Sequence, residues 1–262
     1  QDNMPVETCG VLNPGSFKVY CDNFNAKDEE LITQYVSNAS AWDFLKSRIP
    51  LFSCPDKEIE MTYYFRWWTF RKHIKETPDG FIITEFLPQV PWSGKYNSIN
   101  CPAGHHFREG RWLHEPRYLD DYARFWFRKG GEPRKYSFWA ADSLYHYYLV
   151  TADPRLMTDL LPDLVANFDA WSDHLVEQAG RPFLYWQTDG ADGGEVSNGG
   201  SGLRPTINSY MYGDAQALAA FATLFPPRGD PNLALRFGRE ADRLRAEILE
   251  HLWNPEMKFF EV

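Results

Sequence analysis

The chain has 262 residues, enough for one large domain or two small ones with a substantial buried core. Its 27 Lys and Arg against 36 Asp and Glu give a net charge of −9, which disfavours nucleic-acid partners because phosphate backbones repel an acidic surface. The longest apolar run, Ala217 to Phe225, is too short to cross a bilayer, so we expect no membrane span. A hydrophobic content of 44% with 24% charged residues indicates a folded chain.

The cysteines and the chain start favour an oxidising compartment. All four cysteines lie in the first 101 residues: Cys9, Cys21, Cys54 and Cys101. The even count, a glycosylation sequon at Asn38-Ala39-Ser40 and a start at Gln1 favour a secreted, disulfide-containing protein whose signal peptide has been removed. The spacing does not choose among the three possible pairings, and an intracellular protein with buried thiols remains the alternative.

In the first half of the chain, the sequence predicts helices and a short strand separated by long connections. Residues 1–27 are rich in Asn, Pro, Gly and Asp and predict a loop, and 28–48 predict one or two peripheral helices. From Asp56 to Ile74, apolar and aromatic side chains cover nearly every face of a helix, so we expect protein all around it. A short strand is predicted at 80–87, followed by a long connection without regular structure at 88–113.

The second half alternates two kinds of helix. The segment around 118–126 and the segments 156–175 and 237–252 carry apolar residues on one face only. The segments 137–150 and 206–225 are apolar almost all round. Helices that alternate in this way are typical of two concentric layers, whereas a simple four-helix bundle gives every helix one wet face. The pattern therefore predicts an all-α toroid with short β-strands in its long loops.

We divide the chain into an N-terminal loop and helix segment, residues 1–55, and three helical hairpins, residues 56–262. The absence of a fixed-period repeat disfavours a solenoid. The sequence ends at 253–262 on an apolar, strand-like run with no predicted partner. We therefore expect a further chain segment to complete the toroid.

The connection 88–113 gathers side chains that suit sugar recognition: Trp92, His105, His106, Arg108, Glu109, Arg111 and Trp112. Guanidinium and carboxylate groups bind adjacent hydroxyls in a defined geometry, and indole rings stack on the apolar faces of sugars. Taken singly, each could be an ordinary hydrogen-bonded residue, with Glu109 paired to a neighbouring Arg. Taken together, they predict a carbohydrate-binding site.

A second connection, residues 188–205, holds Asp189, Asp192 and Glu195 among six glycines. A carboxyl group here could protonate a leaving oxygen if partial burial or a like charge raises its pKa. Acids at positions 1, 4 and 7 of the run do not fit the calcium loop of an EF-hand, and a solvated acidic loop is the remaining alternative. The sequence lacks the motifs of serine hydrolases, phosphate loops and zinc proteases, so we expect no cofactor and no metal.

Three stretches, 64–73, 104–113 and 204–215, resemble the six-hairpin glycosidase superfamily. The likeness is nearest to the (α/α)6 enzymes related to mannosylglycerate hydrolase, trehalase and the processing α-glucosidases, and it covers about residues 56–262. It implies an (α/α)6 barrel, of which this chain would hold the first half. It also implies inverting hydrolysis, in which two carboxyl groups roughly 6.5–9.5 Å apart act as general acid and general base.

The resemblance implies that Glu195 is the general acid. Gly193-Gly194-Glu195-Val196-Ser197 is similar in spacing to the Gly-aromatic-Asp-x-Ser string that carries the acid in mannosylglycerate-hydrolase-like proteins. Because Glu replaces Asp and Gly replaces the aromatic residue, Asp192 remains an alternative. The general base is not carried over, because the matching region lies beyond Val262.

Further candidates for sugar contact lie in or beside the predicted buried helices, with one more at the end of the strand-like segment 183–186: Trp68, Asp142, Arg204, Asn208 and Tyr210, and Trp186. Asp142 could equally be a buried acid paired with an Arg. The sequence thus favours a secreted glycoside hydrolase that cleaves a terminal sugar from an oligo- or polysaccharide. The alternatives are a non-catalytic carbohydrate-binding toroid and a polysaccharide lyase with His105 or His106 and Tyr210 as base and acid.

Overall fold

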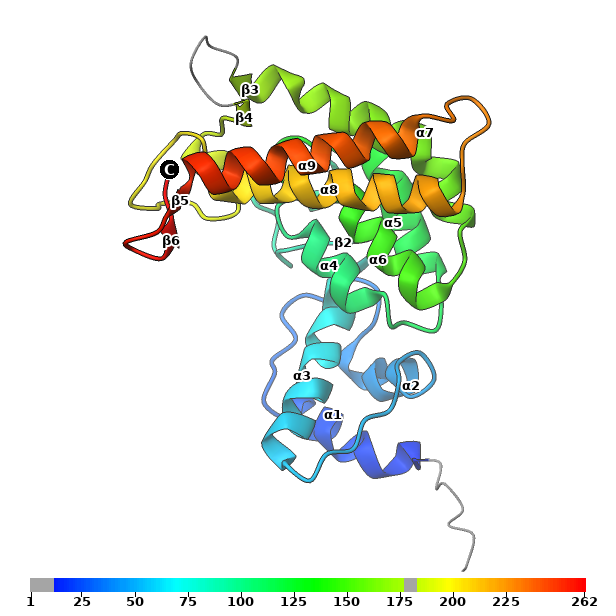
Figure 1. Cartoon of the computed structure of the whole chain (residues 1–262). Coiled ribbons are helices and arrows are strands. Elements are labelled where there is room, and N and C mark those ends of the chain that lie inside the picture. Colours follow the sequence, from blue (N-terminus) through cyan, green and yellow to red (C-terminus); the bar gives the residue numbers. More distant parts are fainter. Residues whose placement is uncertain (1–11, 177–182) are drawn as a thin grey trace, which may run out of the picture.

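The computed structural model describes residues 12–176 and 183–262, and in this part the protein is mostly helical (Figure 1). The helices are α1 Lys18–Asn25, α2 Ala41–Leu45, α3 Lys57–His73, α4 Ala103–Gly110, α5 Arg117–Arg128, α6 Ala140–Thr151, α7 Arg155–Ala170, α8 Pro205–Leu224 and α9 Leu233–His251. Three antiparallel hairpins pair β1 Ile74–Thr77 with β2 Gly80–Ile83, β3 Leu175–Val176 with β4 Leu184–Tyr185, and β5 Trp253–Asn254 with β6 Phe259–Phe260. The prediction of an all-α fold with short strands is confirmed.

The helices from α4 to α9 form two layers. α6 packs between α4 and α8, while α5 contacts α7, and α9 runs alongside α8 (Figure 1). The small side chains Ala215 and Ala217 are buried on α8 and allow its neighbours to approach closely. α5 instead buries one aromatic face, including Tyr122 and Trp126, and exposes Arg128. The alternation of fully apolar and one-faced helices thus corresponds to an inner and an outer layer.

The N-terminal segment is more helical at its start than the sequence predicted. The Asn13 side chain accepts the Gly15 N–H and begins a short 3-10 turn that leads into α1, where the sequence predicted a loop. The rings of Phe17 and Tyr20 then stack on Tyr64 of α3, which explains why this polar segment folds. Only the five-residue α2 and a short 3-10 turn occupy the region predicted to hold peripheral helices. The boundary near residue 55 stays a prediction.

The expectation that protein surrounds α3 is wrong for one face. Asp56 caps the helix by accepting the N–H groups of Glu58 and Ile59, as its position before the apolar run suggests. Ile59, Met61 and Phe65 are nevertheless 54%, 43% and 43% exposed. An apolar side chain shows that a face can be buried, and it does not show that a described element packs there.

The connection 88–113 is ordered and contains α4, which corrects the prediction of an irregular loop. Two buried asparagines hold its backbone. The Asn97 amide donates to the carbonyl oxygens of Phe86 and Pro88, both at 2.9 Å, and the Asn100 amide donates to those of Pro133 and Tyr136. These bonds satisfy buried backbone groups that no helix or sheet pairs, so the chain can enter α4 in a fixed orientation.

The C-terminal run also differs from its prediction, because Phe259–Phe260 pairs with Trp253–Asn254 in a hairpin. Among the described cysteines Cys21, Cys54 and Cys101 no disulfide forms, and Cys9 lies outside the described residues. No described helix is long and apolar enough to cross a membrane.

The sequon asparagine lies in the protein interior. Asn38 is only 8% exposed, its amide nitrogen donates to Asp28 Oδ2 at 2.7 Å, and its amide oxygen accepts from the buried Arg71. A glycan is attached to this same nitrogen, so glycosylation would displace a buried hydrogen-bond network. The packing of Asn38 therefore argues against the predicted glycan at this position.

Candidate functional site

The amino-terminal half of α4 borders a hollow of about 390 Å³, which we call the carboxyl compartment. It is lined by Glu85, Phe86, Trp92, Ile99, Cys101, Pro102, His105, Tyr136, Gly193, Glu195 and Tyr210. The lining comes from the chain after β2, the start of α4, the loop 188–203 and the inner helix α8. The fold thus brings the two long connections singled out in the sequence to one place.

A second hollow of about 400 Å³, the arginine compartment, lies next to the first because His105 and Tyr210 line both. Its lining consists of His105, Arg108, Trp139, Asp142, Ser209, Tyr210 and Gly213. Arg108 donates to Asp142 Oδ2 at 2.7 Å, as the paired-acid interpretation of Asp142 predicted. The Trp139 ring contacts those of Tyr210 and His105, with centroids 4.4 and 4.8 Å apart, and forms an aromatic wall.

Two features of the inner helices hold this wall and were not predicted. A Cβ atom on Gly104 would lie 2.1 Å from the Trp139 ring, so only glycine lets α4 approach the indole this closely. Asp214, buried on α8, accepts the backbone N–H of Asp142 at 2.9 Å, and its burial raises its pKa. The start of α6, which carries Asp142 into the compartment, is thereby tied to α8.

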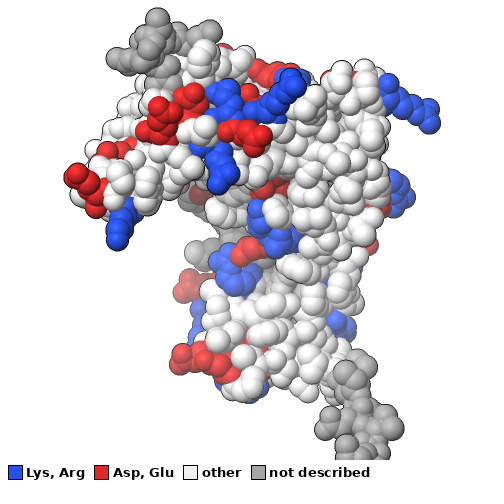
Figure 2. All heavy atoms as spheres, viewed as in Figure 1, with Lys and Arg blue, Asp and Glu red and all other residues white. Residues whose placement is uncertain are grey.

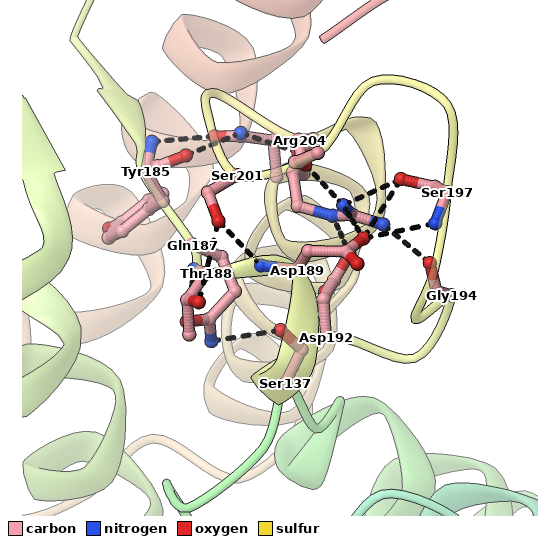
Figure 3. A network of polar contacts seen from close by, with 12 residues as sticks. Ser137, Tyr185, Gln187, Thr188, Asp189, Asp192, Gly194, Ser197, Ser201 and Arg204 are labelled. Atoms are coloured by element: carbon pink, nitrogen blue, oxygen red, sulfur yellow. Dashed lines mark hydrogen bonds and ion pairs between the residues drawn. The ribbon is translucent and has the colours of Figure 1, made fainter.

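The loop 188–203 folds around a single cation, the guanidinium of Arg204 (Figure 3). Arg204 is 3% exposed and donates to Asp192 Oδ2 and Asp189 Oδ1, each at 2.5 Å. It also donates to the carbonyl oxygen of Gly194 at 2.7 Å and to the Ser197 hydroxyl at 2.9 Å. Both aspartates of the loop are therefore used to hold its shape.

The environment of Asp189 and Asp192 explains why both hold the shape of the loop. Asp192 has no exposed surface, so its charge depends on Arg204. Asp189 also accepts the backbone N–H groups of Val196 and Ser197. Burial alone would raise the pKa of Asp189, but the hydrogen bonds from Ser197, Val196 and Arg204 outweigh it and hold the pKa below its usual value.

Glu195 is the acid of this loop that faces the carboxyl compartment. It is exposed, and no described residue forms an ion pair or a hydrogen bond with its carboxylate. Glu85 lines the same hollow and is also exposed; partial desolvation there, and then the charge of Glu195, raise its pKa. Sequence reasoning missed Glu85, although its position near the end of a predicted strand entering a long connection was a usable signal.

The remaining residues of the α4 cluster divide between surface and interior. His106 lies against the Tyr122 hydroxyl at 3.0 Å, and burial lowers the pKa of His106 to about 3, so the ring is neutral. Glu109 accepts a hydrogen bond from Arg66 Nε at 2.9 Å, in agreement with the alternative that Glu109 is paired with an Arg. Arg66, Glu109 and Trp112 line a wider groove of about 640 Å³ along α3.

Arg111 lies at the end of α4 beside the Trp112 ring, with its guanidinium carbon 5.4 Å from the ring centroid. Burial, then the neighbouring charge of Arg108, lowers the pKa of Arg111. Arg108 and Glu109 therefore lie on the last turn of α4, and Arg111 and Trp112 follow its end directly. Arg108 lines the arginine compartment and the groove along α3, whereas Glu109 and Trp112 line only the groove of these two.

Like His106, Glu109, Arg111 and Trp112, four further predicted contact residues line neither compartment. Trp68 is buried between α3 and α1, where its indole N–H donates to Asn25 Oδ1 at 2.8 Å. Asn208 is buried and hydrogen-bonds both the N–H and the carbonyl oxygen of Tyr185. Arg204 lies inside its loop, and Trp186 is exposed beside His174. Polar and aromatic residues in a sequence motif therefore include those that maintain the fold around the site.

Among the described residues, no group of three or more His, Cys, Asp or Glu side chains is arranged to hold a metal ion. Basic and acidic side chains are intermingled on the face shown in Figure 2, without a continuous basic surface. The site therefore presents carboxyl groups, one Arg–Asp pair and aromatic walls as its chemistry.

Comparison with known proteins agrees with this arrangement. Residues 95–197 and 182–262 match the family described as the mannosylglycerate hydrolase MGH1-like glycoside hydrolase domain. The chain belongs to this glycoside hydrolase family. The predicted resemblance to six-hairpin glycosidases is thereby confirmed.

A solved structure named sialidase is 42% identical and superposes with a TM-score of 0.88. The match covers 95% of this chain and 23% of that one, so this member of the glycoside hydrolase family corresponds to less than a quarter of the longer protein. No curated protein matches the chain.

Proposed function

We propose that this chain carries the general acid and a large part of the sugar-binding surface of a secreted glycoside hydrolase that removes a terminal sugar with inversion. The observation that carries the proposal is the position of Glu195. It faces an aromatic-walled compartment without a partner, whereas Asp189 and Asp192 of the same loop are held by Arg204. Membership of the glycoside hydrolase family supports the reaction class.

In this proposal the substrate spans the two compartments. One sugar ring stacks against Trp92 or Tyr210 in the carboxyl compartment, and the rest of the substrate passes His105 towards Arg108 and Asp142. The carboxyl proton of Glu195 passes to the glycosidic oxygen as the bond from the anomeric carbon to that oxygen breaks. A water on the opposite face forms the new bond to the anomeric carbon and gives its proton to a base. We place the base in a further segment of the polypeptide.

Arg204 is a positioning residue, because it holds the loop that carries Glu195. Its guanidinium donates to the carbonyl oxygen of Gly194, the residue directly before Glu195, and to both aspartates of the loop. A proton donor must be held close to its productive geometry, and a glycine-rich loop has no stiffness of its own to do so.

Two observations disfavour the lyase alternative, although His105 and Tyr210 line both compartments. His106 is hydrogen-bonded to Tyr122 in the interior, and burial keeps its ring neutral. Burial also raises the pKa of Tyr210, with the charge of Asp192 adding to this effect. A tyrosine whose proton is held more tightly is a weaker acid, and lyase chemistry needs an efficient donor at this position.

The test uses Glu195→Gln in the full-length protein, with Glu250→Gln as the matched control. Glu250 is an exposed carboxylate on α9 outside both compartments. Glu195→Gln should lower turnover of a glycoside by about 10²–10⁴-fold and leave sugar binding in place, because only proton donation is lost. Proton NMR of the released sugar should show the anomer opposite to that of the substrate.

Two results would count against the proposal. Unchanged turnover in Glu195→Gln would move the acid to another residue. A full-length protein that hydrolyses no glycoside, while still binding sugars, would instead favour the non-catalytic carbohydrate-binding toroid.

A further inference from the structure

The lining of the carboxyl compartment has an excess of acidic side chains. Of the described residues that line it, two are glutamates and none is Lys or Arg. Neither Glu85 nor Glu195 forms an ion pair with a described residue. The compartment therefore presents two carboxyl groups to its contents, with His105 as the remaining basic side chain of its lining.

The adjoining hollows contain arginines: Arg66 lines a hollow that Glu85 also borders, and Arg108 lines the arginine compartment. Next to the carboxyl compartment, Glu109 is paired with Arg66 and Asp142 with Arg108. In the loop above, one buried arginine holds both aspartates. The protein thus supplies cations to the neighbouring acids and leaves Glu85 and Glu195 without one.

We propose that Glu85 is a specificity-determining residue that makes the carboxyl compartment accept uncharged sugar rings and reject sugars that carry a carboxylate. The proposal rests on the proposed function, since it names the class of sugar that the site of Glu195 takes. It assigns a role to a residue outside the loop that supplies the general acid.

Charge repulsion disfavours a sugar carboxylate in the carboxyl compartment. A general acid acts in its protonated form, so Glu85 in its ionised form is the group that gives the compartment a negative charge during the reaction. Glu85 and Glu195 line one hollow without Lys or Arg, and partial desolvation and then the charge of Glu195 raise the pKa of Glu85. A sugar carboxylate bound here would meet the same repulsion, in a hollow whose other walls are mainly aromatic and apolar.

Hydrogen bonding to Glu85 disfavours a sugar carboxylate as well. A carboxylate can only accept hydrogen bonds, and the hydroxyl groups of an uncharged sugar ring are donors. Hydrogen bonds to an ionised acceptor are about twice as strong as those between neutral groups. A sugar carboxylate offers another acceptor where Glu85 needs a donor. The same residue therefore favours the neutral ring and disfavours the acidic one.

The experiment compares matched sugars that differ by one carboxylate: glucose with glucuronate, galactose with galacturonate, and mannose with mannuronate. Binding to the full-length protein is followed by tryptophan fluorescence and by saturation-transfer NMR. We expect the best neutral sugar to bind about tenfold more tightly than its uronate. The difference should shrink at high salt, since ions screen a partly exposed charge.

Three variants show whether Glu85 causes the difference. Glu85→Gln keeps the size of the side chain and removes the charge, and it should reduce the tenfold preference to about threefold or less. Glu85→Asp keeps the charge and should retain the preference. Glu250→Gln changes the net charge equally at a distant surface and should behave like the unmodified protein. Thermal unfolding of each variant confirms that it is folded.

The outcomes separate this inference from the proposed function. A uronate that binds as tightly as its neutral sugar, or a preference that Glu85→Gln leaves unchanged, would overturn the inference while sugar binding itself remains. A protein that binds and hydrolyses none of the saccharides would contradict the proposed function together with it.

Discussion

The two sides of the loop 188–203 use the same chemical group in opposite ways. On the inner side, Asp189 and Asp192 surround the guanidinium of Arg204. On the outer side, Glu195 faces a hollow with Glu85 and no cation (Figure 3 shows the inner side). The three acids of the loop span only seven residues. The presence of a paired arginine, and not the number of acids, therefore decides which carboxyl group of the loop is available for chemistry.

The inner side is the part that fixes the geometry. A carboxylate without exposed surface, such as Asp192, is stable only with a partner of opposite charge. The glycines of the loop allow it to wrap around Arg204. Arg204 donates a hydrogen bond to the carbonyl oxygen of Gly194, the residue directly before Glu195. The outer side can leave its carboxyl groups unpaired because they remain in contact with solvent.

Removing Arg204 should have the largest effect. Arg204→Met leaves the buried charge of Asp192 uncompensated, and we expect the free energy of unfolding to fall by about 3–5 kcal/mol. The control Arg155→Met removes an exposed guanidinium on α7 and should change it by less than about 0.5 kcal/mol. Urea denaturation of both variants provides the measurement. Equal free energies of unfolding for Arg204→Met and Arg155→Met would show that the inner side of the loop does not depend on the charge of Arg204.

The architecture could be predicted from the sequence because apolar periodicity records which helix faces are buried. The sequence also located both connections that build the site. It could not assign Asp192, Arg204 or Trp68, because a buried ion pair and a sugar-binding group use the same residue types. It also missed α4, whose start depends on loop bonds from Asn97 and Asn100. It missed Glu85 because the other carboxyl group of the same hollow, Glu195, lies 110 residues further along the chain.

Neutralising one acid on each side gives the second test of the comparison. Asp192→Asn removes a charged hydrogen bond in the interior and should lower the free energy of unfolding by about 2 kcal/mol. Glu195→Gln removes an exposed, unpaired charge and should change it by less than about 0.5 kcal/mol. Equilibrium denaturation at neutral pH measures both. A larger loss in Glu195→Gln would mean that the two sides have been assigned the wrong way round.

The pH dependence of stability should have opposite signs on the two sides, with the smallest effects. The pKa of Asp189 is lowered in the folded protein, so its contribution is present above the unfolded value of about 3.9 and is lost as pH falls through the folded pKa. The pKa of Glu85 is raised, so its contribution is complete below about pH 4.3 and is lost as pH rises through the folded pKa.

Variants separate these two contributions. Glu85→Gln should match the unmodified protein near pH 4 and become the more stable of the two as pH rises. Asp189→Asn should remove part of the loss of stability on the acid side. Unfolding free energies measured from pH 3 to pH 8 provide the test, because the differences between each variant and the unmodified protein should change in opposite directions as pH rises. A change in the same direction for both variants, or none for either, would contradict the opposite environments of the two carboxyl groups.

The account depends most on Glu195 being the proton donor while Asp192 holds the loop, and leaving-group dependence tests this directly. Hydrolysis of a glycoside and of the matching glycosyl fluoride is compared in Glu195→Gln and Asp192→Asn of the full-length protein. Fluoride leaves with little protonation, so Glu195→Gln should lose the glycoside reaction and keep most of the fluoride reaction. Asp192→Asn should lower both reactions by a similar factor. The opposite pattern, with selective loss of the glycoside reaction in Asp192→Asn, would contradict the account.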